Sequence, residues 1–115
     1  MKDTIRQRLE KQVDRYEEVG RLLAAPDIDG SSNQFRELSM EYARLTPMAE
    51  RFEAYRRCEA ELRAAEALAT DADADMRGMG EEEVRRLEPL LGSLELELRR
   101  SLIPVDTRDA RNVFL

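Results

Sequence analysis

Apolar residues recur every three or four positions along most of this chain, which is the spacing of one face of an α-helix. The first such run predicts a helix from about Asp3 to Ala25, ended by Pro26; its apolar positions are Ile5, Leu9, Val13, Tyr16, Val19 and Leu23. The turn-forming residues PDIDGSS follow. Ser31 with Gln34 has the spacing of a capping box, so a second helix is predicted to begin there.

The second helix is predicted to be short. Its apolar positions are Phe35, Leu38, Tyr42 and Leu45. Thr46 followed by Pro47 has the order of a helix cap and a first-turn proline, so we expect a third helix to start at Pro47, with a bend of the chain there as the alternative to a full turn. The apolar positions of this third helix are Met48, Phe52, Tyr55, Cys58, Leu62, Ala65 and Leu68.

The last predicted helix follows the interruption TDADADMRGMG, which has room for short helical turns. It opens with Glu81–Glu83 and closes with Arg99 and Arg100, an order of charges that suits the helix dipole. Its apolar positions are Val84, Leu87, Leu91, Leu94, Leu98 and Leu102. An interior proline costs about 3 kcal/mol. Burial of six apolar side chains outweighs this cost, so we expect the helix to persist with a bend between Arg86 and Pro89.

These helices predict an all-α fold, an elongated antiparallel three- to four-helix coiled-coil-like bundle over residues 1–104 with a short extended tail over 105–115. Solvent-facing surfaces are marked by Glu–Arg pairs four residues apart. The pairs are Glu17–Arg21, Glu53–Arg57, Glu59–Arg63, Glu81–Arg85 and Glu95–Arg99.

Composition and net charge restrict the classes of function that this chain can have. The net charge of −6 argues against broad, non-specific nucleic-acid binding but leaves a local RNA contact open. The N-terminal residues lack the apolar core of a signal peptide, and there is no apolar run long enough to span a membrane, so a cytoplasmic location is expected.

One acidic cluster invites a calcium hypothesis. Asp71, Asp73, Asp75 and Glu82 occupy positions 1, 3, 5 and 12 of an EF-hand loop. Met76 stands where that loop requires glycine, so we interpret the segment as an acidic, solvent-exposed turn, a choice that a calcium titration decides.

Other reactive side chains also favour structural roles. The chain has no histidine, so the usual base for the single cysteine, Cys58, is missing. The place of Cys58 on an apolar stripe predicts a buried core thiol.

The methionines and the arginine pairs are also given structural roles. Met48 is expected in the core, whereas Met76 and Met79 are expected to be exposed. Ion pairing is expected for the arginines at 85, 86, 99 and 100, with phosphate contact as the alternative. We predict no catalytic, cofactor-binding or metal-binding residue, and no enzymatic activity.

The C-terminal stretch RRSLIPVDTRDARNVFL resembles the junction after the N-terminal helical domain of bacterial class I peptide chain release factors, the type that reads UAA and UAG. The matching positions are Ile103–Asp106, Asp109 and Asn112–Leu115. Upstream, Glu41-Tyr42-Ala43, the Leu45-Thr46-Pro47 break and the segment ADMRGMGEEEV are also similar to that family. Departures are Val105, where the family often has lysine, Pro89, and the less helical RGMG.

The resemblance implies a role in translation termination. It implies that residues 105–115 are a linker and the start of a strand of a further domain, where Val113, Phe114 and Leu115 would be buried. Codon reading and peptidyl-tRNA hydrolysis belong to later domains of that family, so no catalytic residue is carried over. The implied partners are the ribosome, at the GTPase-associated region of the large subunit near protein L11 and its rRNA, and the GTPase release factor.

Antiparallel packing places Asp71–Gly80 at the end of the bundle remote from Pro104, where we expect the ribosome contact. The alternative from a different class is a free-standing coiled-coil adaptor that binds another helical protein. The reading frame beyond Leu115 separates the two, because a release factor continues there into a glycine-rich motif.

Overall fold

The computed structural model describes residues 1–102, and within this range every regular element is a helix. The predicted all-α class is therefore confirmed. There are three helices: α1 (Asp3–Ala24), α2 (Asn33–Leu68) and α3 (Ala74–Ser101). The predicted domain boundary after Pro104, the tail 105–115 and the strand start at 113–115 lie outside the described residues.

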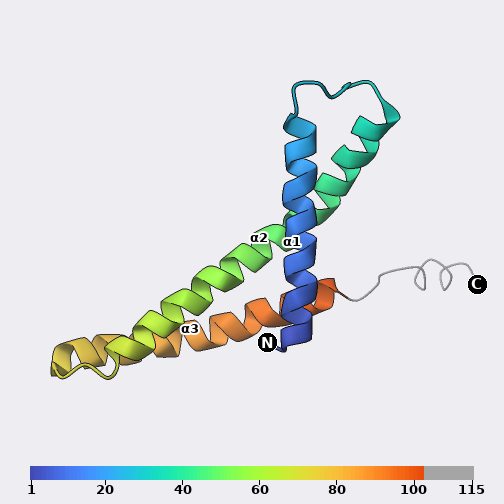
Figure 1. Cartoon of the computed structure of the whole chain (residues 1–115). Coiled ribbons are helices and arrows are strands. Elements are labelled where there is room, and N and C mark those ends of the chain that lie inside the picture. The colour runs from blue at the N-terminus through green and yellow to red at the C-terminus, as the bar shows by residue number, and fades with distance from the viewer. Residues whose placement is uncertain (103–115) are drawn as a thin grey trace, which may run out of the picture.

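α2 is a shared spine on which the other two helices pack (Figure 1). α1 packs beside the first half of α2 and reaches into the second as far as Glu59, and α3 returns along the second half (Figure 1). The molecule measures 62 × 47 × 20 Å, and its radius of gyration is 19.7 Å, against about 13 Å for a compact domain of similar length. The predicted elongated form is confirmed, but it consists of two helical pairs that diverge from a common junction.

The predicted helix break at Pro47 is wrong, because α2 runs without interruption from Asn33 to Leu68. A proline within a helix cannot donate to the carbonyl four residues before it. Leu45, Met48 and Phe52, on both sides of this point, are buried in one core cluster, and their burial keeps the helix together. Figure 1 shows α2 changing direction where it passes behind α1.

Two helix starts also differ from the predicted ones. α2 is capped by Ser32, whose hydroxyl accepts from the amide of Phe35 at 3.0 Å, whereas Ser31 donates to Asp29 at 2.8 Å. The predicted cap at Ser31 was thus one residue early. α3 begins at Ala74 and not at Glu81, because Asp73 caps it by accepting from the amide of Asp75 at 2.9 Å. α3 continues through Pro89 as expected, and the bend near it stays a prediction.

The main core cluster joins all three helices at the junction. Its buried members are Leu9 from α1, Leu98 from α3, and four residues of α2, which are Leu45, Met48, Phe52 and Tyr55. A second cluster of Cys58, Ala65 and Leu87 holds α2 to α3 and includes no residue of α1. The positions that are buried are those of the predicted apolar stripes, with Gly80 as the exception.

Ion pairs between helices add to this core. The guanidinium of Arg15 in α1 donates two hydrogen bonds to Glu41 in α2, at 2.7 and 2.8 Å. Beside it, the rings of Tyr16 and Tyr42 stack with their centroids 4.5 Å apart. Near the other end of α1, Arg6 donates to Glu59 at 2.8 Å. These contacts fix the position of α1 along α2.

The predicted pairs within single helices are confirmed in part. Glu53–Arg57, Glu59–Arg63 and Glu95–Arg99 approach to 3.6, 3.8 and 3.7 Å. Among the described residues, no ion pair within 4.0 Å joins Glu17 to Arg21 or Glu81 to Arg85. These four side chains are exposed to solvent. None of the described helices is both long and apolar enough to cross a lipid bilayer.

Two leucines of α3 offer a test of the junction. Leu98 is 0% exposed in the main cluster, whereas Leu96 is 49% exposed. We expect Leu98→Ala to lower the free energy of unfolding by about 2–5 kcal/mol because it leaves a cavity. Leu96→Ala is the matched control, with an expected change below about 0.5 kcal/mol. Urea unfolding followed by circular dichroism measures both, and equal effects would contradict the assigned packing.

The Arg15–Glu41 pair predicts a dependence of stability on pH. The hydrogen bonds from Arg15 lower the pKa of Glu41 below its ordinary value. The folded state therefore binds this proton less readily than the unfolded state, so the pair stabilises the fold at neutral pH and its contribution is lost as pH falls through the lowered pKa.

We expect the loss of stability between about pH 7 and about pH 3 to be smaller in Glu41→Gln than in the parent chain. Thermal unfolding at both pH values measures the difference. Glu37→Gln removes the same charge from the same part of α2 and serves as control. A Glu41→Gln chain that follows the parent at both pH values would refute the pairing.

Candidate interaction surface

The turn between α2 and α3 forms the free end of the longer helical pair, and Figure 1 shows it at the opposite end of α3 from the C-terminal end of that helix. We call residues 69–82 the hairpin tip. Because α3 is a continuous helix of 28 residues, at about 1.5 Å per residue the tip lies on the order of 40 Å from Leu102. The remote position expected for Asp71–Gly80 follows from this geometry.

Hydrogen bonds within the tip hold its shape. Asp71 accepts from the amide of Asp73 at 2.8 Å, and Asp73 in turn accepts from the amide of Asp75. Arg77, one turn into α3, donates back to the carbonyl of Asp71 at 3.0 Å. Two acidic side chains are thus used as backbone caps, which leaves a short and well-defined turn.

Gly80 allows α3 to lie directly against the end of α2. A Cβ atom at this position would stand 2.4 Å from the nitrogen of Ala69 and 2.8 Å from the carbonyl oxygen of Ala65. No side chain fits at these distances to backbone atoms. Sequence reasoning missed this residue, because a glycine in a run of turn-forming residues gives no sign of close packing.

The outer surface of the tip combines apolar and acidic side chains. Met76 and Met79 are 43% and 58% exposed, as expected, while Met48 is buried in the core. The exposed acids of the tip are Asp71, Asp73, Asp75, Glu81 and Glu82, against the single cation Arg77. An exposed methionine pair is an adaptable apolar contact, and its acidic surroundings favour a partner that offers positive charge at that point.

The segment does not form the EF-hand loop that was considered. Position 6 of that loop, Met76, and position 12, Glu82, both lie within α3. The four carboxylates therefore extend along a turn and a helix and do not surround one point. In the described part of the chain, no group of three or more potential ligands has the geometry of a metal site.

Cys58 is a core residue, as predicted. It is 4% exposed, its sulfur lies 3.8 Å from the carbonyl oxygen of Leu87, and burial raises the pKa of the thiol. A thiol that resists ionisation is a poor nucleophile.

The four arginines of α3 divide into paired and exposed residues. Arg86 forms two hydrogen bonds with Glu83 and lies 3.8 Å from Glu61, and Arg99 lies 3.7 Å from Glu95. The predicted ion-pairing role is confirmed for these two. Arg85 and Arg100 are exposed and form no ion pair within residues 1–102.

The model of the PCRF domain matches residues 12–115, which is most of the chain. The chain therefore belongs to the PCRF domain family, which is found in peptide chain release factors, and this membership supports a role in translation termination. No solved structure matches the chain.

Two glycines near the tip allow a matched test of its packing. We expect Gly80→Ala to destabilise the chain, since its Cβ meets backbone atoms that cannot move away. At Gly78 a Cβ meets nothing within 4 Å, so Gly78→Ala should stabilise α3 by about 0.5–1 kcal/mol. Thermal unfolding measures both variants. Stabilisation by both substitutions would show that α2 and α3 do not approach closely at the tip.

Proposed function

We propose that this chain is the docking arm of a class I peptide chain release factor of the type that reads UAA and UAG. The arm acts in the cytoplasm and holds the factor on the ribosome at the GTPase-associated region of the large subunit. Its partners there are protein L11 with its rRNA, and the GTPase release factor. Stop-codon reading and polypeptide release are assigned to other domains of the factor, and this domain performs no catalytic step.

The observation that carries the proposal is the hairpin tip in a chain of the PCRF family. An arm needs a stiff body and a free end that offers a surface. The body is provided by two core clusters along α2, and the free end by the exposed pair Met76 and Met79 on a turn fixed by its own hydrogen bonds. Ion pairs between helices, such as Arg15–Glu41 and Arg6–Glu59, add to the stiffness of the body.

The acidic character of the tip restricts how it makes this contact. Carboxylates repel RNA phosphates, so we assign the tip to the protein component of the docking region. The rRNA would then be contacted by the exposed arginines of the arm, of which Arg85 is the nearest to the tip along α3.

Variants of the complete factor test the docking role. We expect the combined change Met76→Ser, Met79→Ser and Asp75→Lys to weaken binding to ribosomes that hold a stop codon by about tenfold, through loss of apolar and charge contacts. None of these residues is buried or caps a helix through its side chain. Peptide release by factor that is already bound should keep its rate, because the chemistry lies elsewhere.

The control changes residues of the same types near the other turn of the molecule. Met40→Ser combined with Asp27→Lys changes an exposed methionine and an exposed acid near the α1–α2 turn, and ribosome binding should be unaffected. Filter binding or fluorescence anisotropy with labelled factor gives the dissociation constants. Unchanged binding of the tip variant would reject the tip as the docking site and favour an adaptor role for the arm.

A further inference from the structure

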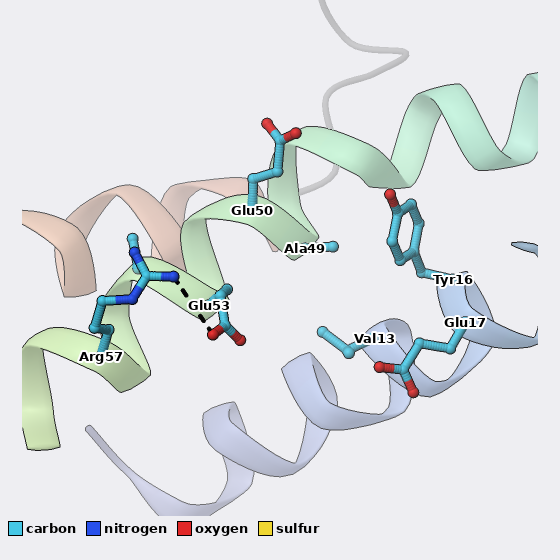
Figure 2. A pocket seen from close by; sticks show the side chains of 8 residues that line it. Val13, Tyr16, Glu17, Ala49, Glu50, Glu53 and Arg57 are labelled. Carbon is cyan, nitrogen blue, oxygen red and sulfur yellow. Dashed lines mark ion pairs between the residues drawn. The ribbon is translucent and has the colours of Figure 1, made fainter.

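The side of the molecule where α1 leaves α2 carries an open groove that the proposed docking role does not use. Its volume is about 390 Å³, and it is lined by residues of these two helices only, which are Val13, Tyr16, Glu17, Ala49, Glu50, Glu53, Ala54 and Arg57. Figure 2 shows α1 along one side, with Val13 and Tyr16 directed toward α2. We call it the α1–α2 groove.

Small residues of α2 open this groove. Ala49 and Ala54 stand where a longer side chain would fill the space between the diverging helices. Val13 and Tyr16 form its apolar floor, and both pack against the main core cluster, so the floor is continuous with the core. Stacking on Tyr42 at 4.5 Å holds the Tyr16 ring in place before any ligand arrives.

The rim of the groove is negatively charged. Its lining holds three carboxylates, Glu17, Glu50 and Glu53, and a single guanidinium, that of Arg57. The Arg57–Glu53 pair, drawn as a dashed line in Figure 2, is long at 3.6 Å and both side chains are well exposed. An exposed pair of this kind contributes little to stability, so an incoming cation can displace Arg57 from Glu53 at little cost.

We propose that the α1–α2 groove binds an arginine side chain presented by a helical segment of a partner protein. The apolar floor accepts the methylene stem, and the rim carboxylates accept the guanidinium, which binds carboxylate oxygens in pairs. Complementary charge selects this occupant over RNA, whose phosphates the three carboxylates repel. The groove is small, within the lower part of the usual range for ligand sites, and suits one or two side chains.

The test uses the chain of residues 1–115 and a short alanine-based helical peptide that carries leucine and arginine one turn apart. A matched peptide has glutamate in place of arginine, and single-stranded oligouridylate represents RNA. Amide NMR shifts locate binding, and anisotropy of labelled peptide gives its affinity. We expect the arginine peptide alone to bind, with shifts concentrated at Val13, Tyr16, Ala49 and Ala54.

Variants distinguish binding of the arginine peptide in the groove from its non-specific attraction to an acidic protein. Glu17→Gln with Glu53→Gln should weaken binding about fivefold, whereas Arg57→Gln should strengthen it about twofold by releasing Glu53 and removing a like charge. Glu66→Gln with Glu88→Gln removes the same charge from exposed positions outside the groove and should leave affinity unchanged. Circular dichroism confirms that each variant is folded.

Several results would overturn the proposal. They are no binding of the arginine peptide, equal weakening in the Glu66 and Glu88 control, no gain in affinity from Arg57→Gln, or shifts at the groove caused by oligouridylate. The proposal concerns a different surface from the hairpin tip, so loss of ribosome docking by the tip variants has no bearing on it.

Discussion

The rest of the structure depends on one junction, where side chains of all three helices are buried against one another. The most deeply buried of them are Leu9, Phe52, Tyr55 and Leu98. Each of the three helices contributes to this junction, and it is the only core cluster among the described residues that includes α1. Helices of this length gain most of their stability from packing of an apolar face and not from intrinsic propensity. Without the junction, α1 would lose its main reason to remain on α2.

The same junction explains how α2 tolerates Pro47. A helix interrupted by proline loses a hydrogen bond and about 3 kcal/mol. Burial of several large side chains on both sides of the proline exceeds that cost when α1 and α3 are in place. The change of direction in α2 also separates the two helical pairs, so the molecule extends in two directions while keeping one core.

The two parts of α2 therefore offer different surfaces for binding. The half of α2 that packs with α3 extends away from the junction to a turn that is closed by Gly80 and fixed by aspartate caps, which suits a contact made at a distance. Near the middle of α2, between residues 49 and 57, α1 and α2 leave an open acidic groove with an apolar floor. The two proposed contacts, at the tip and in the groove, lie on different parts of the molecule, so neither partner would block the other.

The amino-acid sequence by itself determined the helical class, the positions that are buried and the residues that are exposed at the tip. This was possible because apolar periodicity reflects neighbours three and four residues apart on one helix. Predictions at the boundaries were weaker: the cap of α2 is Ser32 and not Ser31, and α3 starts at Ala74 and not at Glu81.

Only the tertiary structure decided the continuity of α2, the Arg15–Glu41 pair, the burial of Gly80 and the α1–α2 groove. The Thr46-Pro47 sequence is a sound local signal for a helix start, and it is overruled by side chains from α1 and α3 that are distant in sequence. Arginine and glutamate occur so often in this chain that no spacing rule singles out residues 15 and 41. Gly80 matters because the backbone of residues 65–69 lies against it. Each of these features depends on which faces of the helices meet. Contacts between residues that are distant in sequence decide this, and the local periodicity of the chain carries no information about such contacts.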